Sequence, residues 1–295
     1  MYAITGATGH TGRIFAETLL KAGKKVRVLG RDAEKLKGLV AQGAEAVVGN
    51  VEDAEFLTQA FTGVTAAYIL IPPNLQTPDI LAYQNKIGEA QTEAIKKAGV
   101  KYVVHLSSIG AHSPVGTGPV AGLFYQERRL NKLPDTHVLH LRPGYFMENI
   151  LNSIGMIKGM GINGGPLSAD IKMGFTATRD IGNYAAKRLL ALDFTGKEVQ
   201  ELIGSKDMTP QEFTSILGAA VGKADLKWVQ FPDEDAFNSM TGMGISASMA
   251  RSFVDMSQFL RNGGGNVVIR DAENTTPTTG EQFAKEIFAP AFNAG

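Results

Sequence analysis

Three glycines close to the N-terminus are spaced to bind a phosphate group. Gly6, Gly9 and Gly12 follow a short apolar segment and precede apolar residues at helical spacing, which predicts a strand, a tight turn and a helix. Glycine permits the backbone of such a turn and lets a phosphate approach the N–H groups at the helix N-terminus. The G-x-x-G-x-x-G spacing is one residue wider than the common dinucleotide fingerprint, and a pyrophosphate is the expected ligand. The residues expected around it are Gly6, Thr8, Gly9, His10, Thr11 and Gly12.

The residue type at position 31 bears on which dinucleotide is bound. In dinucleotide-binding folds an Asp or Glu about 20 residues beyond the glycines binds the ribose of NAD, whereas an Arg nearby accommodates the extra phosphate of NADP. Arg31 lies 19 residues beyond Gly12, and the carboxylate of Asp32 comes one position later. NADP(H) is therefore favoured over NAD(H). Lys35 is a candidate second cation, and the alternative for both cations is a solvated surface charge.

Further candidate residues lie just past the ends of other predicted strands. Because the carboxyl ends of parallel strands meet at one edge of a sheet, these residues are expected to converge on the cofactor. Asn50 and Val51 are expected beside the adenine. Ser107 and Ser108 are candidate catalytic residues that bond a substrate oxygen or the nicotinamide ribose, or else they satisfy backbone groups where their strand ends. The other residues expected along the cofactor are Ile71, Pro72, Gly144, Tyr145 and Phe146.

A regular alternation of strands and helices is expected to position these residues. After the N-terminal strand and its helix, apolar runs and helical periodicity alternate as far as Arg142-Pro143-Gly144. This alternation predicts an α/β fold of the Rossmann type, with a doubly wound parallel sheet. The expected strands cover 25–30, 44–48, 66–71, 101–106 and 138–141, and the expected helices cover 33–42, 54–61, 78–98 and 120–131.

The pattern changes from about Met147 onward. The glycines between 155 and 165 are too frequent for a regular helix and predict a flexible segment over a cleft, or a lid. A helix from 178 to about 192 and a strand over 198–203 are expected to return to the main sheet. Thr209 and Glu212 form a capping box with Pro210 at the first helical position, and Thr279 and Gln282 repeat it weakly. Between the two boxes we expect a strand at 226–231, helices at 234–240 and 247–260, and a loop at 261–266.

These elements predict two unequal parts. Residues 1–150 form the NADP(H)-binding domain, and 176–204 return to it. Residues 151–175 and 205–295 form a smaller C-terminal α/β lobe that contacts the substrate or a partner.

Composition excludes several classes of protein. The 295 residues include 29 basic and 29 acidic side chains, so the net charge gives no signal for nucleic-acid binding. No cysteine is present, which removes disulfides and thiolate metal sites, and the five histidines lack metal-ligand spacing. No apolar run is long enough for a membrane span. The glycine loop begins too near Met1 to leave room for a secretory signal, so a cytoplasmic location is expected.

Four segments together resemble the NmrA-like family of atypical or extended short-chain dehydrogenase/reductase-type proteins. They are Gly-Ala-Thr-Gly-His-Thr-Gly-Arg at 6–13, His-Leu-Ser-Ser-Ile-Gly-Ala at 105–111, Leu-Arg-Pro-Gly-Tyr-Phe-Met-Glu-Asn at 141–149 and Thr-Arg-Asp-Ile at 178–181. The resemblance implies a Rossmann fold that binds NAD(P)H, with a cleft between the sheet and a small C-terminal lobe. Family members are either flavin-free quinone reductases or catalytically silent redox sensors that bind partner proteins.

The sequence departs from typical short-chain dehydrogenases at their proton-delivering pair. Those enzymes use Tyr-x-x-x-Lys, in which the lysine lowers the pKa of the tyrosine. The nearest match here is Tyr125 with Arg129, whose planar guanidinium does not reproduce the compact ammonium of lysine. Tyr125 is a candidate catalytic residue, and the alternative is a packing or surface aromatic.

The absent lysine favours an acceptor that needs little help with proton transfer. A quinone accepts hydride readily, so the protein has only to hold it against the nicotinamide and exclude water. We therefore expect an oxidoreductase that passes hydride from NADPH to a quinone-like or other electron-poor small molecule, without flavin or metal. The alternative is an NADP(H) redox sensor or regulator that acts through a protein partner.

Overall fold

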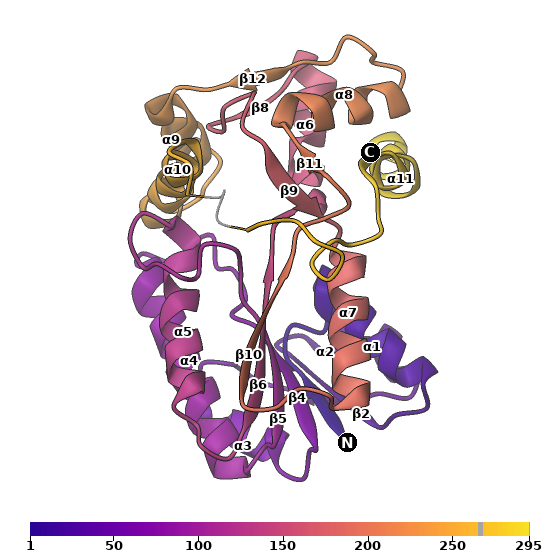
Figure 1. The fold of residues 1–295 in the computed structure, drawn as a ribbon, viewed down its shortest axis with the longest axis vertical. Coiled ribbons are helices and arrows are strands. Elements are labelled where there is room, and N and C mark those ends of the chain that lie inside the picture. Colours follow the sequence, from indigo (N-terminus) through magenta and orange to yellow (C-terminus); the bar gives the residue numbers. More distant parts are fainter. Residues whose placement is uncertain (265–267, 295) are drawn as a thin grey trace.

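Seven parallel strands form the central sheet of the computed structural model, which describes residues 1–264 and 268–294 (Figure 1). Their spatial order is β10-β6-β5-β4-β1-β2-β3, so the chain winds outward in both directions from β1 and β4. A reversal of strand order of this kind defines a doubly wound sheet and confirms the predicted fold class. The strands are β1 (Tyr2–Ile4), β2 (Val26–Gly30), β3 (Glu45–Val48), β4 (Ala66–Ile69), β5 (Tyr102–Leu106), β6 (His137–Pro143) and β10 (Lys197–Leu202).

Helices cover both faces of this sheet (Figure 1). One face carries α1 (His10–Lys21), α2 (Ala33–Val40) and α7 (Thr178–Ala191), and the other carries α3 (Ala54–Phe61), α4 (Ile80–Ala98) and α5 (Ala121–Asn131), which follows the 3-10 turn η1 (Gly118–Val120). Asp32, Asp53 and Asp79 begin α2, α3 and α4 by accepting hydrogen bonds from N–H groups of the first turn. Two separate hydrophobic clusters, one on each face, hold the helices against the strands.

The smaller lobe lies over the end of the sheet where β6 finishes (Figure 1). Two short sheets, β11-β9-β7 and β12-β8, form its centre. A third hydrophobic cluster, which runs from Met147 to Phe292, holds it together. Its elements are β7 (Tyr145–Phe146), the 3-10 helix η2 (Met147–Ser153), α6 (Ile154–Met160), β8 (Asn163–Gly165), β9 (Met173–Thr176), β11 (Asp207–Met208), α8 (Pro210–Ala220), β12 (Trp228–Gln230), α9 (Asp233–Gly242), α10 (Ala247–Arg261), α11 (Gly280–Phe283), the π-helical turn η3 (Ala284–Phe288) and α12 (Ala289–Ala294).

Most predicted elements of the second half are confirmed. The expected seventh strand forms as β10, which pairs in parallel with β6 from Lys197 to Leu202. Both capping boxes are present, at Thr209 with Glu212 and at Thr279 with Gln282. The loop expected at 261–266 begins one residue later because α10 includes Arg261, and its last two residues lie outside the described part of the chain. Within that part, no helix combines the length and the apolar character needed to cross a membrane.

The prediction that the glycine-rich segment forms no regular helix is wrong. Helix α6 includes Gly155 and Gly159, around which a β-carbon would meet open space. Each glycine weakens a helix by roughly 1 kcal/mol relative to alanine. The full burial of Ile157 in the third hydrophobic cluster offsets this cost. Gly161 then ends the helix in the left-handed conformation, with φ of +69°.

Candidate functional site

The glycine loop leaves the start of α1 open to a ligand. Gly6 has φ of +65°, and a β-carbon on Gly12 would lie 2.3 Å from the Gly6 carbonyl oxygen, so both positions require glycine. Gly9 caps α1 without a side-chain hydrogen bond, so the first N–H groups of the helix face outward unpaired by any cap. Thr11 is buried, and its Oγ1 accepts a hydrogen bond of 3.0 Å from the Tyr68 hydroxyl of β4. This cradle of bare backbone fits the pyrophosphate of a dinucleotide.

Arg31 follows β2 directly and is exposed at the same end of the sheet. The carboxylate of Asp32 is occupied as the cap of α2, where it accepts the Glu34 N–H at 2.9 Å. Tyr83 of α4 donates its hydroxyl to the Pro72 carbonyl at 3.1 Å. Burial raises the pKa of Tyr83, and the positive charge of Arg31 opposes that rise. Among the described residues the Arg31 side chain forms no ion pair, and Tyr83 is a residue at this edge that the sequence did not reveal.

The remaining adenosine-side residues lie on loops at this edge. Asn50 is exposed, and its Oδ1 accepts the Glu52 N–H at 3.1 Å in a tight turn, while Val51 is buried against α3 and β4 residues. Ile71 and Pro72 are half-buried just beyond β4. Thr8, Gly9 and His10 are exposed within the glycine loop.

The two serines that end β5 have different surroundings. Ser107 is buried and donates its hydroxyl to Glu127 Oε1 of α5 at 2.5 Å. Glu127 in turn accepts two hydrogen bonds from Arg142, at 2.9 and 2.6 Å. Ser108 is half-buried and lines a cavity, although its hydroxyl also contacts the Ile109 carbonyl oxygen at 2.9 Å. Ser108 is thus the serine that a bound molecule can reach.

Tyr125 and Arg129 do not act on each other. Arg129 turns toward α4, where its Nη2 donates to Asn85 Oδ1 at 2.7 Å and reaches Glu89 at 3.3 Å. The ring of Tyr125 is 37% exposed and packs edge-on against Phe124. Tyr125 is absent from the described walls of the cavities beside Ser108, so its expected catalytic role stays a prediction that the geometry does not favour.

A cavity of about 280 Å³, here called the outer chamber, opens beside Ser108 and Gly144 at the ends of β5 and β6. Gly144 approaches the smaller lobe closely, since a β-carbon there would lie 2.4 Å from the Gly174 carbonyl oxygen. The Tyr145 and Phe146 side chains line the chamber from β7, and Phe259 lines it from α10. Three of the residues predicted for the nicotinamide end, Gly144, Tyr145 and Phe146, therefore share one cavity.

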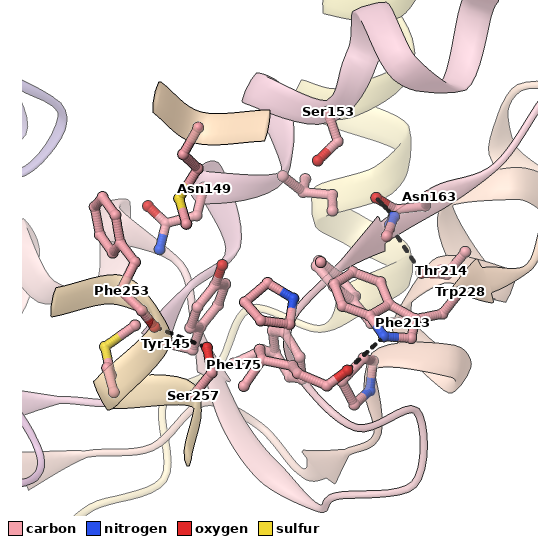
Figure 2. Close-up of a pocket in the computed structure, with 18 residues that line it drawn as sticks. Tyr145, Asn149, Ser153, Asn163, Phe175, Phe213, Thr214, Trp228, Phe253 and Ser257 are labelled. Atoms are coloured by element: carbon pink, nitrogen blue, oxygen red, sulfur yellow. Dashed lines mark hydrogen bonds between the residues drawn. The ribbon is translucent and has the colours of Figure 1, made fainter. Parts of the chain in front are cut away.

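A second cavity of about 180 Å³, here called the inner chamber, lies deeper in the smaller lobe (Figure 2). The two chambers are adjacent, since four residues line both: Tyr145, Asn149, Phe253 and Met256. In Figure 2 the Tyr145 ring stands between the α10 residues on one side and the aromatic side chains of Phe175, Phe213 and Trp228 on the other. None of Asn149, Phe253, Met256 and Trp228 was predicted as a site residue, because their approach to Tyr145 depends on tertiary packing.

No charged side chain lines either chamber in the described part of the chain. Burial raises the pKa of Tyr145, against the opposing effect of the nearby Asn149 amide, so the phenol stays protonated at neutral pH. Residues 1–264 and 268–294 also contain no group of three His, Asp or Glu side chains that could hold a metal ion. The chambers therefore suit an uncharged, flat, apolar molecule held by a few neutral hydrogen-bonding groups.

Comparisons with known proteins agree with this arrangement. The model of the NmrA-like family matches residues 2–268. An NAD(P)H azoreductase from Xenophilus azovorans is 32% identical over 254 residues, which cover 85% of this chain and 84% of that protein. Quinone oxidoreductase 2 from Escherichia coli strain K12 is 27% identical over 269 residues, covering 90% of this chain and 89% of that protein.

The fold also resembles a solved structure that contains a dinucleotide. The NADPH-dependent quinone oxidoreductase from Escherichia coli, in complex with NADPH, superimposes with a TM-score of 0.82 at 24% identity. The superposition covers 98% of this chain and 100% of that one. At this level of identity the likeness establishes the shared fold.

Proposed function

This chain belongs to the NmrA-like family, and from that premise we propose that it is an NADPH-dependent reductase of quinone-like or other electron-poor aromatic molecules. The observation that carries the proposal is the outer chamber, which adjoins the ends of β5 and β6 and has uncharged, mostly apolar walls that include the rings of Tyr145, Phe146, Phe253 and Phe259. The names of two relatives, an NAD(P)H azoreductase and a quinone oxidoreductase, support the same class of reaction.

The roles of individual residues follow from their positions. The backbone around Gly6, Gly9 and Gly12 would hold the pyrophosphate, and Arg31 would pair with the 2′-phosphate of NADP(H) through charge-assisted hydrogen bonds. When bound, NADPH supplies hydride from its nicotinamide ring. Ser108 and Gly144 lie at the end of the sheet where that ring is expected. A preference for NADP(H) over NAD(H) and the absence of flavin and metal are parts of the proposal.

The chambers favour an acceptor that needs no side-chain acid. Reduction of a quinone to a hydroquinone requires one hydride, which carries both electrons, and one proton. The described walls contain no His, Asp, Glu or Lys side chain, so water supplies the proton. The protonated Tyr145 hydroxyl is available to donate a hydrogen bond to the oxygen that gains charge, whereas the Ser108 hydroxyl would first have to leave the Ile109 carbonyl oxygen. The apolar walls hold and orient the ring.

The alternative is a redox sensor in which NADP(H) occupies the same loop without turnover and changes the affinity for a regulatory protein. Two measurements separate the alternatives. Anaerobic stopped-flow absorbance at 340 nm follows NADPH oxidation with a panel of quinones, and we expect oxidation well above the rate without protein. Absence of oxidation with every quinone, together with partner capture that differs between the NADP⁺ and NADPH forms, would replace the reductase with the sensor.

A further inference from the structure

The inner chamber has the size and the walls of a site for one aromatic ring. Its volume is about 180 Å³, close to the roughly 150 Å³ of an engineered apolar cavity that binds benzene. Phe175, Phe213 and Trp228 line it, and Figure 2 shows their rings grouped on one side of Tyr145. Aromatic walls favour a flat apolar guest through stacked or edge-on contacts.

Two polar side chains that line the inner chamber, Asn163 and Trp228, already form hydrogen bonds within the protein. The Asn163 amide donates to Thr214 Oγ1 at 2.9 Å, and its Oδ1 accepts the Gly164 N–H at 3.0 Å. The Trp228 indole N–H donates to the Leu167 carbonyl at 2.9 Å. Because these two side chains need no further partner and no charged side chain lines the chamber in the described part of the chain, an uncharged ring fits it.

The two chambers adjoin at Tyr145, Asn149, Phe253 and Met256, which line both. With volumes of about 280 and 180 Å³, they together fall within the range of about 300–1,000 Å³ usual for small-molecule sites. A single-ring acceptor in the outer chamber leaves the inner chamber without a guest. An acceptor with a second ring fills both.

We propose that the inner chamber is a second aromatic subsite, and that the preferred acceptor carries an uncharged ring joined to the ring that is reduced. This inference rests on the proposed function for the outer chamber and adds the shape of the substrate class. The residues that set this specificity are those of the inner chamber alone, above all Trp228, Phe213 and Ser153. In Figure 2 the Ser153 hydroxyl points into the chamber from the end of η2, so a larger side chain at this position would fill it.

A matched pair of acceptors tests the subsite by kinetics. We expect 2-phenyl-1,4-benzoquinone to have a kcat/KM roughly tenfold to a hundredfold above that of 1,4-benzoquinone, the gain from burying one phenyl group. Ser153→Phe should reduce this ratio to about twofold and leave kcat/KM for 1,4-benzoquinone within about twofold. Ser153→Ala, which keeps the chamber open, should retain the full ratio. Comparing ratios between variants cancels the different intrinsic reactivity of the two quinones.

Trp228 provides a readout that does not depend on activity. It is the single tryptophan of the chain, and it lines the inner chamber. Titration of the unmodified protein with 2-phenyl-1,4-benzoquinone, without NADPH, should quench its fluorescence to saturation at micromolar concentration, and 1,4-benzoquinone should not. The chain has no cysteine, so arylation of thiols by the quinone does not interfere.

The outcomes separate the two proposals. Equal kcat/KM for the two quinones, or an equal loss with both in Ser153→Phe, overturns the second subsite and leaves the reductase intact. Oxidation of NADPH by neither quinone, with saturable quenching of Trp228 by the phenyl compound, overturns the reductase and retains a two-ring binding site. Absence of saturable quenching overturns the subsite whatever the kinetics, and a melting temperature for Ser153→Phe near that of Ser153→Ala shows that the variant is folded.

Discussion

Glu127 and Arg142 form a bidentate ion pair that joins α5 to β6 next to the outer chamber. Arg142 Nε and Nη2 donate to the two carboxylate oxygens at 2.9 and 2.6 Å, and the two side chains are only 17% and 7% exposed, for Arg142 and Glu127 respectively. The hydrogen bond to Glu127 is the largest cause of a raised pKa for the Arg142 guanidinium, which burial opposes. Ser107 completes the group, and Arg142 immediately precedes Pro143 and Gly144 of the chamber wall.

Removing one partner of this pair should be costly. Glu127→Ala leaves the Arg142 charge half-buried without a partner, and we expect a loss of about 2–4 kcal/mol in the free energy of unfolding. Ser107→Ala removes one hydrogen bond to a carboxylate that keeps its arginine, and should cost about 1 kcal/mol. Urea denaturation of both variants measures the difference. A cost for Glu127→Ala no greater than that for Ser107→Ala would show that the pair contributes little.

Arg31 should determine the choice of cofactor. Arg31→Ala is expected to weaken NADPH binding by more than about tenfold and to leave NADH binding nearly unchanged, because only NADPH loses a charge-assisted contact to its 2′-phosphate. Isothermal titration calorimetry with both nucleotides measures the two effects. Lys35→Ala, one helical turn further along α2, is the matched loss of a positive charge and should change NADPH binding much less. If Arg31→Ala weakened the binding of NADPH and NADH equally, Arg31 would not recognise the 2′-phosphate.

Alanine substitutions at Gly12, in the glycine loop, and at Gly38, in α2, should change the stability of the protein in opposite directions. In Gly12→Ala the new methyl group meets the Gly6 carbonyl oxygen at 2.3 Å, so the loop must move away from α1. We expect a loss of more than about 2 kcal/mol in stability and of measurable NADPH binding. Gly38→Ala lies in the exposed part of α2, where the methyl group meets open space, and should raise stability by about 0.5–1 kcal/mol. Thermal melting measures the stability of both variants, and NADPH titration measures their binding. Unaltered NADPH binding in Gly12→Ala would contradict the role of the glycine loop as the pyrophosphate site.

Two buried histidines in the central sheet should make the fold sensitive to acid. The Nδ1 atoms of His105 on β5 and His140 on β6 lie 3.1 Å apart, and His140 Nε2 contacts Asn131 Oδ1 at 2.9 Å. Burial lowers the pKa of each imidazole to about 3, so both are neutral at pH 7. Positive Arg142 and Lys197 add to the lowering of the His140 pKa, and Glu127 opposes that of His105.

The direction of the effect follows from the difference between the folded and unfolded pKa values. Between pH 6.5 and about 3 the unfolded chain binds protons that the folded chain does not, so stability is full above pH 6.5 and falls as the pH drops. At pH 5 we expect a loss of roughly 2–4 kcal/mol relative to pH 7.5. Urea denaturation at both pH values measures it. In His105→Leu the loss between the two pH values should be about half as large, and an unchanged loss would exclude His105 as a cause.

The central sheet could be predicted because its signals are local. The apolar run that forms β4, the cap at Asp53 and the glycines of the turn between β1 and α1 each lie within a few adjacent residues. Their order along the chain then leaves few arrangements for a parallel sheet. The position of Arg31 at the end of β2 could be predicted for the same reason, since its distance from the glycine loop along the chain is fixed by one helix and one strand.

The chambers and the ion pair could not be predicted in the same way. The helix at 247–260 was expected, but the side of α10 that meets Tyr145 depends on contacts between residues about 110 positions apart, so the sequence did not place Phe253 and Met256 in the chamber walls. Glu127 looks like a surface residue of an amphipathic helix. The one available signal was Arg142, a charge that follows the apolar run of β6 and so requires a buried partner.

The extent of the third hydrophobic cluster, from Met147 to Phe292, has a consequence for how the protein is made. Strands β1 to β6 leave the ribosome first and can pair as they emerge, because domains generally fold from the N-terminus during synthesis. Phe175 and Phe213, which line the inner chamber, instead gain their neighbours Phe283 and Phe288 in this cluster only after a further stretch of chain has been made. A nascent chain therefore carries a completed central sheet beside an exposed apolar surface until Phe283 and Phe288 have emerged, and that surface is what chaperones would engage.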